Sequence, residues 1–325
     1  MIDFVRFVVE EAPIRFLEQH KDLDFIEERY CELPEENGGK GFIHADFKSL
    51  RIKICSPMTT LNNGLRIKTP NAEPYVVIEG SLHKYWNELN NRGSQNYNDF
   101  GIEGIIEVLE DLEDRFRISP ERCTLKQVEL GVNIQPPDDT KKILQHCFLH
   151  KTKELKWTYV HDEGSYKQAV YNNHIIKIYD KSLHYSKLGK NIKPTLRFEI
   201  KFKRMRWLNE NGVYTLWDLV FYGLHKFELK LAKEWNNILF YDYNVLDIVP
   251  HQNDYCNPNY WQNLLKTPHN FKYHRDKLKK LIGANPHSIK SKMAEIIEKK
   301  WKQLFGDTSQ ITSYYIRRKQ LVDIA

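Results

Sequence analysis

The chain has 325 residues, of which 41% are hydrophobic and 13% aromatic, and it contains 15 Gly and 13 Pro. This composition excludes a disordered, low-complexity or collagen-like chain and suffices for one large domain or two smaller ones. No stretch reaches the roughly 18 uninterrupted apolar residues of a membrane span. The first segment, MIDFVRFVVEE, lacks the long apolar region of a signal peptide, so we expect a cytoplasmic protein with no membrane partner.

The net charge of +6 is distributed unevenly along the chain. Residues 177–206 contain ten Lys or Arg against two acids, and residues 251–325 contain fourteen against six, so each segment carries a net charge of +8. Residues 103–114 instead carry six acids on what the spacing predicts to be one solvated helix. A single charge run is usually a solvated face, but two large basic segments together indicate a polyanionic partner, and we expect nucleic acid.

The cysteines favour neither a disulfide framework nor a zinc site. Five are present, an odd number, and none forms a Cys-x-x-Cys pair. Cys147 lies between His146 and His150, in a segment that we interpret as an ordinary helix.

In chain order, the first half alternates strand-like and helix-like segments. Residues 102–116 place Ile and Leu at helical spacing after Asn98 or Asp99, either of which would cap an amphipathic helix. A shorter helix is predicted for 140–149. Strands are predicted for 1–9, 42–57, 64–70, 73–82 and 123–134.

The second half begins with further extended segments and ends in helices. Strands are predicted for 155–162, 174–181 and 195–203. Thr215 and Asp218 resemble a capping box at the start of a helical region. Residues 289–304 form an amphipathic pattern with lysines on the outer face.

This order of elements predicts the α+β class: a mostly antiparallel sheet with helices packed on one face, followed by a helical basic C-terminal region. The corresponding domains are a catalytic domain at 1–248, a linker at 249–260 and a basic helical accessory DNA-binding region at 261–325. An alternative for the last region is that its helix packs against the first domain and only its lysines face solvent.

Alternation along three strands predicts a shared polar surface. Because successive strand side chains point to opposite faces, the polar face of 174–181 carries Lys177, Tyr179 and Lys181. By the same rule Glu129 lies opposite Val128 and Leu130, and Arg197, Glu199, Lys201 and Lys203 lie opposite the apolar residues of 195–203. If the strands share one sheet, these groups gather on one solvent-accessible surface.

Such a surface suits phosphate chemistry. Two carboxylates can hold Mg²⁺ or Mn²⁺, which prefer oxygen ligands. Adjacent ammonium groups favour the phenolate form of a tyrosine, which is the nucleophilic form, and Lys181 could stabilise charge on a phosphate under attack. The ordinary alternatives are a solvated Glu and a Tyr that packs across the strands.

Several segments, in order, resemble the replication initiators of filamentous phages and related rolling-circle phage and plasmid elements. The resemblance covers about the first 220 residues, a span estimated from the position of its last motif. The longest motif has an acid in a strand, then Arg-Trp-Leu, an Asn-Gly turn and Leu-Trp-Asp-Leu. The motifs are MIDFVRF, IEGSLHKYWNELN, VELGVNI, KIYDKSLHY and LRFEIKFKRMRWLNENGVYTLWDL.

The resemblance implies a metal-dependent, site-specific DNA endonuclease that nicks and rejoins a strand through a 5′-phosphotyrosine and frees a 3′-hydroxyl. Tyr179 would be the nucleophile and Lys181 its companion. The metal candidates are Glu129, Glu199 and Glu79, with Asp3 a weaker one, and the metal would be Mg²⁺ or Mn²⁺. The basic residues expected to contact DNA are Lys177, Arg197, Lys201, Lys203, Arg204 and Lys84.

One departure distinguishes this chain from many rolling-circle initiators. It lacks the histidine–hydrophobe–histidine metal motif, so it resembles a carboxylate-using branch of the tyrosine endonucleases. DNA at an origin, exposed as single strand or hairpin, is the expected partner, with a host helicase and polymerase as further ones. The alternatives are a mobilisation relaxase or transposase with the same tyrosine chemistry, and a non-catalytic origin-binding copy-control protein.

Overall fold

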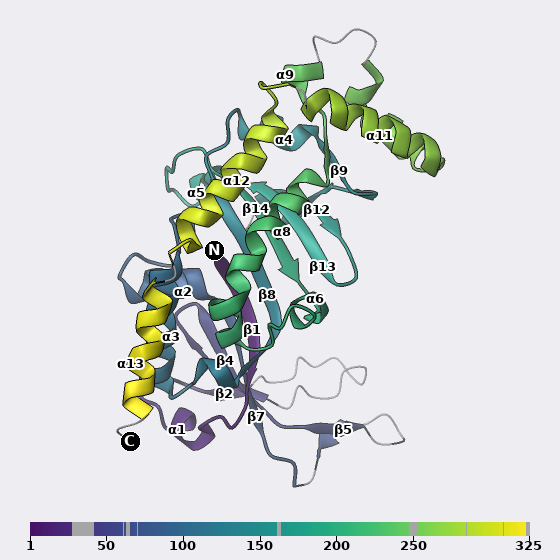
Figure 1. Cartoon of the computed structure of the whole chain (residues 1–325). Coiled ribbons are helices and arrows are strands. Elements are labelled where there is room, and N and C mark those ends of the chain that lie inside the picture. The colour runs from purple at the N-terminus through teal and green to yellow at the C-terminus, as the bar shows by residue number, and fades with distance from the viewer. Residues whose placement is uncertain are drawn as a thin grey trace. The chain divides into compact units, whose positions relative to one another are not determined.

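A computed structural model describes residues 1–27, 42–60, 62, 66–69, 71–160, 164–246, 253–283, 285–307 and 309–322. They form two compact units made of interleaved segments (Figure 1). Unit 1 comprises Met1–Leu130, Phe202–Leu224 and Asp307–Ala325, and unit 2 comprises Gly131–Lys201 and His225–Gly306. The chain therefore returns to unit 1 twice, so this division differs from the linear one expected at 249–260.

Unit 1 contains strands in the order β8-β1-β7-β4-β3-β2. β7 pairs antiparallel with both β1 and β4, which places Glu79 opposite Arg6 on one side and Arg51 on the other. The bounds are β1 Ile2–Val9, β2 Ile26–Glu27, β3 Phe42–Phe47, β4 Leu50–Cys55, β7 Tyr75–Ser81 and β8 Cys123–Ile134, with a separate pair β5 Met58–Thr60 and β6 Arg66–Lys68.

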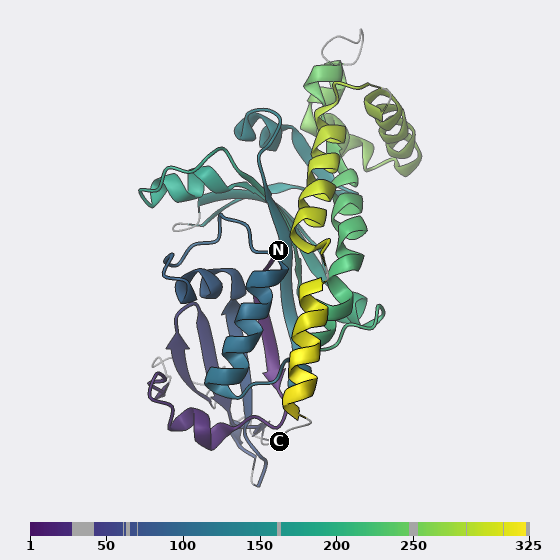
Figure 2. The same ribbon diagram turned by 60° about the vertical axis from the view of Figure 1, so that its left-hand side comes forward.

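Helices cover the apolar face of this sheet because aromatic side chains from both layers meet there. Phe47 on β3 contacts Tyr85 of α2 and Phe116 of α3, with ring centroids 6.1 and 5.4 Å apart. α3 and α13 run side by side (Figure 2), joined by a 2.6 Å hydrogen bond that Tyr314 donates to Glu113. The helices are α1 Ile14–Glu18, α2 Leu82–Leu89, α3 Ile102–Phe116, a 3-10 turn Pro120–Arg122, α6 Arg206–Asn209, α7 Leu216–Asp218, a π-helical turn Leu219–Gly223 and α13 Ser309–Val322.

Unit 2 contains strands in the order β11-β12-β13-β14-β8, with β8 entering at Gly131. β12 pairs antiparallel with β11 and β13, and this register puts Tyr166 opposite Tyr179. A second small sheet has the order β10-β9-β15. The bounds are β9 Cys147–His150, β10 Lys153–Glu154, β11 Lys156–Val160, β12 Gly164–Val170, β13 His174–Asp180, β14 Leu196–Phe202 and β15 Ile238–Phe240.

Two long helices, α8 and α12, lie side by side across one face of these strands (Figure 1). Phe198 on β14 meets Trp235 of α8 at 5.6 Å, and Phe227 of α8 meets Trp301 of α12 at 6.4 Å. The alternation that predicted Phe198 and Ile200 as the apolar face of their strand is therefore confirmed. The helices are α4 Thr140–His146, α5 Lys181–Lys187, α8 Leu224–Asn236, α9 Tyr243–Leu246, a 3-10 turn Asn253–Cys256, α10 Pro258–Leu264, α11 Pro268–Gly283 and α12 Ile289–Phe305.

Several local expectations need correction. The helix predicted for 140–149 ends at His146, because Cys147–His150 pairs with β15 as a strand. The long acidic helix begins after Gly101, not after a side-chain cap at Asn98 or Asp99. Of the expected linker, 249–252 lies outside the described residues, and the remainder contains a 3-10 turn and the start of α10.

The fold is α+β with a large, mostly antiparallel sheet, as the pattern of elements predicted. The helix predicted at 289–304 is α12, and Thr215 and Asp218 form the expected capping box. Within the described parts of the chain, none of the helices combines the length and apolar character needed to span a bilayer.

Candidate functional site

Tyr179 and Lys181 lie together where β13 ends in unit 2. Asp180 caps α5 by accepting a 2.9 Å hydrogen bond from the Leu183 backbone N–H, so the strand ends there and Lys181 begins the helix. The Lys181 Nζ lies 3.4 Å from the Tyr179 hydroxyl oxygen and donates to it. Lys181 is only 3% exposed, so its charge acts on the phenol in a partly dry environment.

Aromatic rings enclose the Lys181 ammonium. Its Nζ lies 5.3 Å from the ring centroids of both Tyr179 and Tyr185. On the neighbouring strand, Tyr166 packs edge-on against Tyr179 at 6.5 Å. Tyr179 therefore packs across the strands, which was one alternative from the sequence, and also contacts Lys181. The two contacts are compatible because Tyr166 packs against the Tyr179 ring, whereas Lys181 donates to the Tyr179 hydroxyl oxygen.

Glu199 is the centre of a buried charge cluster on the polar face of β14. Arg197 Nε donates to its carboxylate at 2.6 Å, and Lys177 Nζ lies 3.3 Å from the other oxygen. Arg197 also donates to Asn133 on β8 at 3.2 Å. Lys177 therefore connects the strand that bears Tyr179 to Glu199.

Gly131 allows β8 and β14 to approach closely at this cluster. A Cβ at Gly131 would lie 2.6 Å from the Phe198 carbonyl oxygen and 2.7 Å from the Glu199 Cβ. Real Cβ atoms do not approach backbone atoms so closely, so a larger residue would force the strands apart. The close packing of β8 against β14 in unit 2 therefore requires a glycine at the position of Gly131 in VELGVNI.

The expectation of a solvent-accessible acidic surface was wrong. Glu199 and Glu129 are 2% and 8% exposed, and Arg197 is fully buried. The alternation placed the polar side chains of β14 on a common face correctly, but that face is buried at Arg197 and Glu199. Arg197 consequently holds Glu199 and Asn133, and a phosphate contact is not available to it in this arrangement.

Glu79, in unit 1, is also held between two cations. Arg6 Nε and Lys53 Nζ each lie 2.6 Å from its carboxylate. Burial by itself would raise the pKa of Glu79, but the hydrogen bonds from Lys53 and Arg6 outweigh burial and keep that pKa below its ordinary value. The sequence did not single out Arg6 or Lys53, because the strand register that brings them to Glu79 is a tertiary property.

The remaining acids of unit 1 occupy different positions. Asp3 is buried and accepts hydrogen bonds from the Ser81 hydroxyl and from the Asn96 amide, the latter at 2.9 Å. Glu129 lies on β8 within unit 1, two residues before Gly131. A shared site of Glu129, Glu199 and Tyr179 stays a prediction.

The expected DNA-contacting residues differ in accessibility. Lys203 and Arg204 follow β14 in unit 1 and are exposed, which suits a phosphate contact. Lys84 on α2 and Lys201 on β14 are half-buried, as is Lys177.

The residues around the two paired carboxylates do not fit a preformed Mg²⁺ or Mn²⁺ site. Each of Glu199 and Glu79 already faces two cationic side chains, so a dication would have to displace or repel them. No group of three or more His, Cys, Asp or Glu side chains suited to a metal ion occurs within the described residues.

Comparisons with known proteins add little to this geometry. No protein-family model matches the chain, and no curated protein matches it. One solved structure, a rolling circle replication initiator protein from Geobacillus stearothermophilus, is similar over 82% of this chain and 94% of that chain, with 13% identity and a TM-score of 0.34. At 13% identity and a TM-score of 0.34, this likeness does not establish the function of this chain.

Proposed function

We propose that this protein nicks and rejoins DNA as a rolling-circle replication initiator, with Tyr179 as the nucleophile. The observation that supports the proposal best is the 3.4 Å hydrogen bond from the buried Lys181 ammonium to the Tyr179 hydroxyl. A tyrosine with an ordinary pKa of about 10 is a poor nucleophile, and a neighbouring ammonium favours its anionic form. The basic segment 177–206 supplies the charge expected around a DNA strand.

The reaction requires few groups. The Tyr179 oxygen attacks the phosphorus of one phosphodiester, its proton passes to solvent, and the P–O bond to the upstream 3′ oxygen breaks. That oxygen takes up a proton as a 3′-hydroxyl, while the downstream strand stays attached as a 5′-phosphotyrosine. Lys181 stabilises the negative charge that develops during attack. Rejoining is the reverse reaction, because the phosphotyrosine ester retains the energy of the broken bond.

The decisive experiment compares Tyr179→Phe with Tyr166→Phe. A pool of single-stranded oligonucleotides labelled at the 3′ end is incubated with the full chain and resolved on a denaturing gel, since the downstream fragment stays on the protein. We expect the parent and Tyr166→Phe to carry label, mapped to Tyr179 by mass spectrometry, and Tyr179→Phe to carry none. Tyr166→Phe is the matched control because its ring packs against Tyr179 on the neighbouring strand.

The outcomes separate the alternatives. An adduct at normal yield in Tyr179→Phe would refute the assignment. DNA binding without any adduct in the parent would favour a non-catalytic origin-binding protein. Lys181→Met should slow adduct formation by about 10²–10³-fold, as loss of one charge-stabilising donor does elsewhere, without abolishing it.

Metal dependence and partners are separate proposals, and a metal ion would have to displace the cations paired with Glu199 and Glu79. Mg²⁺ or Mn²⁺ at Glu129, Glu199 or Glu79 is tested by the metal concentration that gives half-maximal nicking. A host helicase and polymerase are proposed because the reaction would leave a 3′-hydroxyl for extension. The accessory role of 261–325 in DNA binding is tested below through its exposed lysines.

A further inference from the structure

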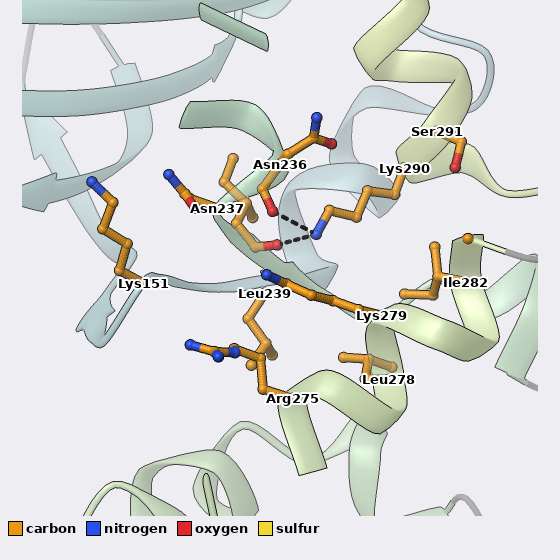
Figure 3. A pocket seen from close by; sticks show the side chains of 12 residues that line it. Lys151, Asn236, Asn237, Leu239, Arg275, Leu278, Lys279, Ile282, Lys290 and Ser291 are labelled. Carbon is orange, nitrogen blue, oxygen red and sulfur yellow. Dashed lines mark hydrogen bonds between the residues drawn. The ribbon is translucent and has the colours of Figure 1, made fainter. Parts of the chain in front are cut away.

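A cavity of about 260 Å³ lies within unit 2, away from Tyr179. It is bounded by the end of α8, by β15, by α11 and by the start of α12 (Figure 3). Four cationic side chains line it: Lys151, Arg275, Lys279 and Lys290. No Asp or Glu is among the lining residues that the structure describes, so one sign of charge dominates the cavity.

Lys290 forms the buried end of the cavity. It is 8% exposed, and its Nζ donates to the backbone oxygens of Asn236 and Ile238 at 3.1 and 2.6 Å (Figure 3). Burial, with the positive charge of Lys279, lowers the pKa of Lys290 to about 8. Two like charges thus face one cavity, and an anion between them would relieve their repulsion.

The other cations differ in how their charge is balanced. Lys151 lies 3.1 Å from Glu234, and Arg275 lies 2.9 Å from Asp276. Neither of these two acids lines the cavity. The Lys279 ammonium has no ion pair or hydrogen bond among the described residues, and the acid one turn before it on α11, Asp276, pairs with Arg275. Its exposed side chain and that of Arg275 both extend from α11 towards β15 (Figure 3).

Part of the wall is apolar. Leu239, Leu278 and Ile282 line the cavity beside the cations of α11, and Asn236 and Asn237 line it as well. A cavity with both an apolar wall and a cationic rim fits a ligand that carries a flat ring and a phosphate. Its volume is near the lower limit of about 300 Å³ for small-molecule pockets, which suits one nucleotide unit and not a dinucleotide.

We propose that this cavity binds one nucleotide unit, with the phosphate between Lys279, Arg275 and Lys290 and the base against Leu239 and Ile282. The unit is either a free mononucleotide or one nucleotide of a single strand, since both present the same chemistry. The site is independent of the nicking reaction, because none of its residues belongs to the Tyr179 cluster.

The test is calorimetric titration of the full chain at low salt with thymidine 5′-monophosphate, thymidine and inorganic phosphate. The variants are Lys279→Ala and Arg275→Ala, and the control is Lys280→Ala, an exposed neighbour on α11 that does not line the cavity. We expect the parent and Lys280→Ala to bind the nucleotide equally. Lys279→Ala and Arg275→Ala should each weaken binding at least tenfold, and thymidine should bind far more weakly than the nucleotide.

Three results would overturn the proposal: no nucleotide binding, the same affinity in Lys279→Ala and Lys280→Ala, or inorganic phosphate binding as tightly as the nucleotide. Displacement of the nucleotide by a single-stranded oligonucleotide would assign the unit to a DNA strand, and retention would assign it to a free nucleotide. Tyr179→Phe should bind the nucleotide normally, so failure of the nicking proposal and failure of this one are distinguishable.

Discussion

At the scale of single residues, the polar side chains of β14 contribute to the stability of the fold as well as to the proposed reaction. Arg197 is fully buried, and its Nε lies 2.6 Å from the Glu199 carboxylate. Taking two charges out of water is costly, and the arrangement is stable only while both partners remain. Any test of Glu199 as a metal ligand must therefore measure stability and metal dependence separately.

We predict that Glu199→Gln lowers the free energy of unfolding by about 3–5 kcal/mol, because it removes the carboxylate charge that faces both the buried Arg197 cation and Lys177. Urea denaturation measures this, with Glu154→Gln, at an exposed acid that lies 4.0 Å from Lys156, as control. Metal titration of nicking is then run on the folded fraction. An unchanged half-saturating concentration would make Glu199 structural, whereas a raised one would support the metal proposal. Equal stability of the two variants would contradict the importance of the Arg197 pair.

His174 gives unit 2 a pH-dependent stability. Its ring stacks on Tyr171 at 4.6 Å, and its buried Nε2 has no hydrogen-bond partner among the residues described. Burial lowers the pKa of His174 from 6.5 to about 4, outweighing the attraction of Glu234. As the pH falls below 6.5, the unfolded chain gains a proton at this ring before the folded chain does, so the free energy of unfolding falls between pH 6.5 and 4.

The expected result is that His174→Phe, which keeps the stacked ring and removes the titration, loses less stability than the parent across that interval. Chemical denaturation at several pH values measures it, and His287→Phe, at an exposed histidine, serves as control. Burial would raise the pKa of Glu234, but hydrogen bonds from His150, Lys230 and Asn237 hold it well below its ordinary value. The contribution of Glu234 to the free energy of unfolding is therefore lost only below about pH 4.5. Parallel pH profiles for parent and His174→Phe would exclude the histidine as the cause.

At the scale of elements, the contact of β8 with β14 depends on one glycine. Gly131→Ala should destabilise unit 2 by about 1–3 kcal/mol or more, since its Cβ would meet backbone and not a yielding side chain. Thermal unfolding measures the effect against Gly283→Ala, where an added Cβ meets nothing within 4 Å. Because the same contact positions Glu199, nicking by Gly131→Ala should fall even under conditions where the protein is folded. If Gly131→Ala is as stable as Gly283→Ala, then β8 and β14 can move apart without a loss of stability, which would contradict the prediction.

The C-terminal helices are built into both units. On α12, Met293, Ile297 and Trp301 are buried, and the Trp235 indole on α8 donates to the Lys290 carbonyl oxygen at 3.0 Å. Removing everything after Val249 would expose this surface together with that under α13. Substitution of exposed lysines is therefore a better test of the proposed DNA-binding role than truncation.

At the scale of the whole molecule, the two basic segments predict salt-dependent DNA binding. Lys292 and Lys299 are exposed on α12. If they meet duplex phosphates, replacing both with Glu should reduce the slope of log K against log salt by about 0.9 for each phosphate that a lysine no longer neutralises. The control is the double variant Lys141→Glu with Lys153→Glu, which changes the net charge by the same amount at exposed positions elsewhere in unit 2. It should change the slope less than the α12 double variant does. Equal changes in both double variants would indicate general electrostatic attraction with no specific role for α12.

Much of the local structure follows from sequence pattern. The alternation in 123–134 predicted β8 with its bounds, and the helical spacing in 102–116 predicted α3, although not its start after Gly101, because period 2 and period 3.6 are properties of a single segment. The same alternation put Tyr179 and Lys177 on the face opposite Ile176 and Ile178, which are both fully buried. β12 was not predicted, since GSYKQAV carries weak apolar alternation and is stabilised by its pairing with β11 and β13.

The sequence by itself determined the class of fold, the faces of the central strands, the amphipathic C-terminal helix and the basic character of the chain. Only the tertiary structure decided which side chains meet. Strand register brought Arg6 and Lys53 to Glu79, packing closed the polar face over Glu199, and the return of the chain after Lys201 and Gly306 divided it into interleaved units. The physical reason is that side-chain periodicity is local, whereas register, burial and the convergence of Lys279 with Lys290 depend on contacts between segments distant in sequence.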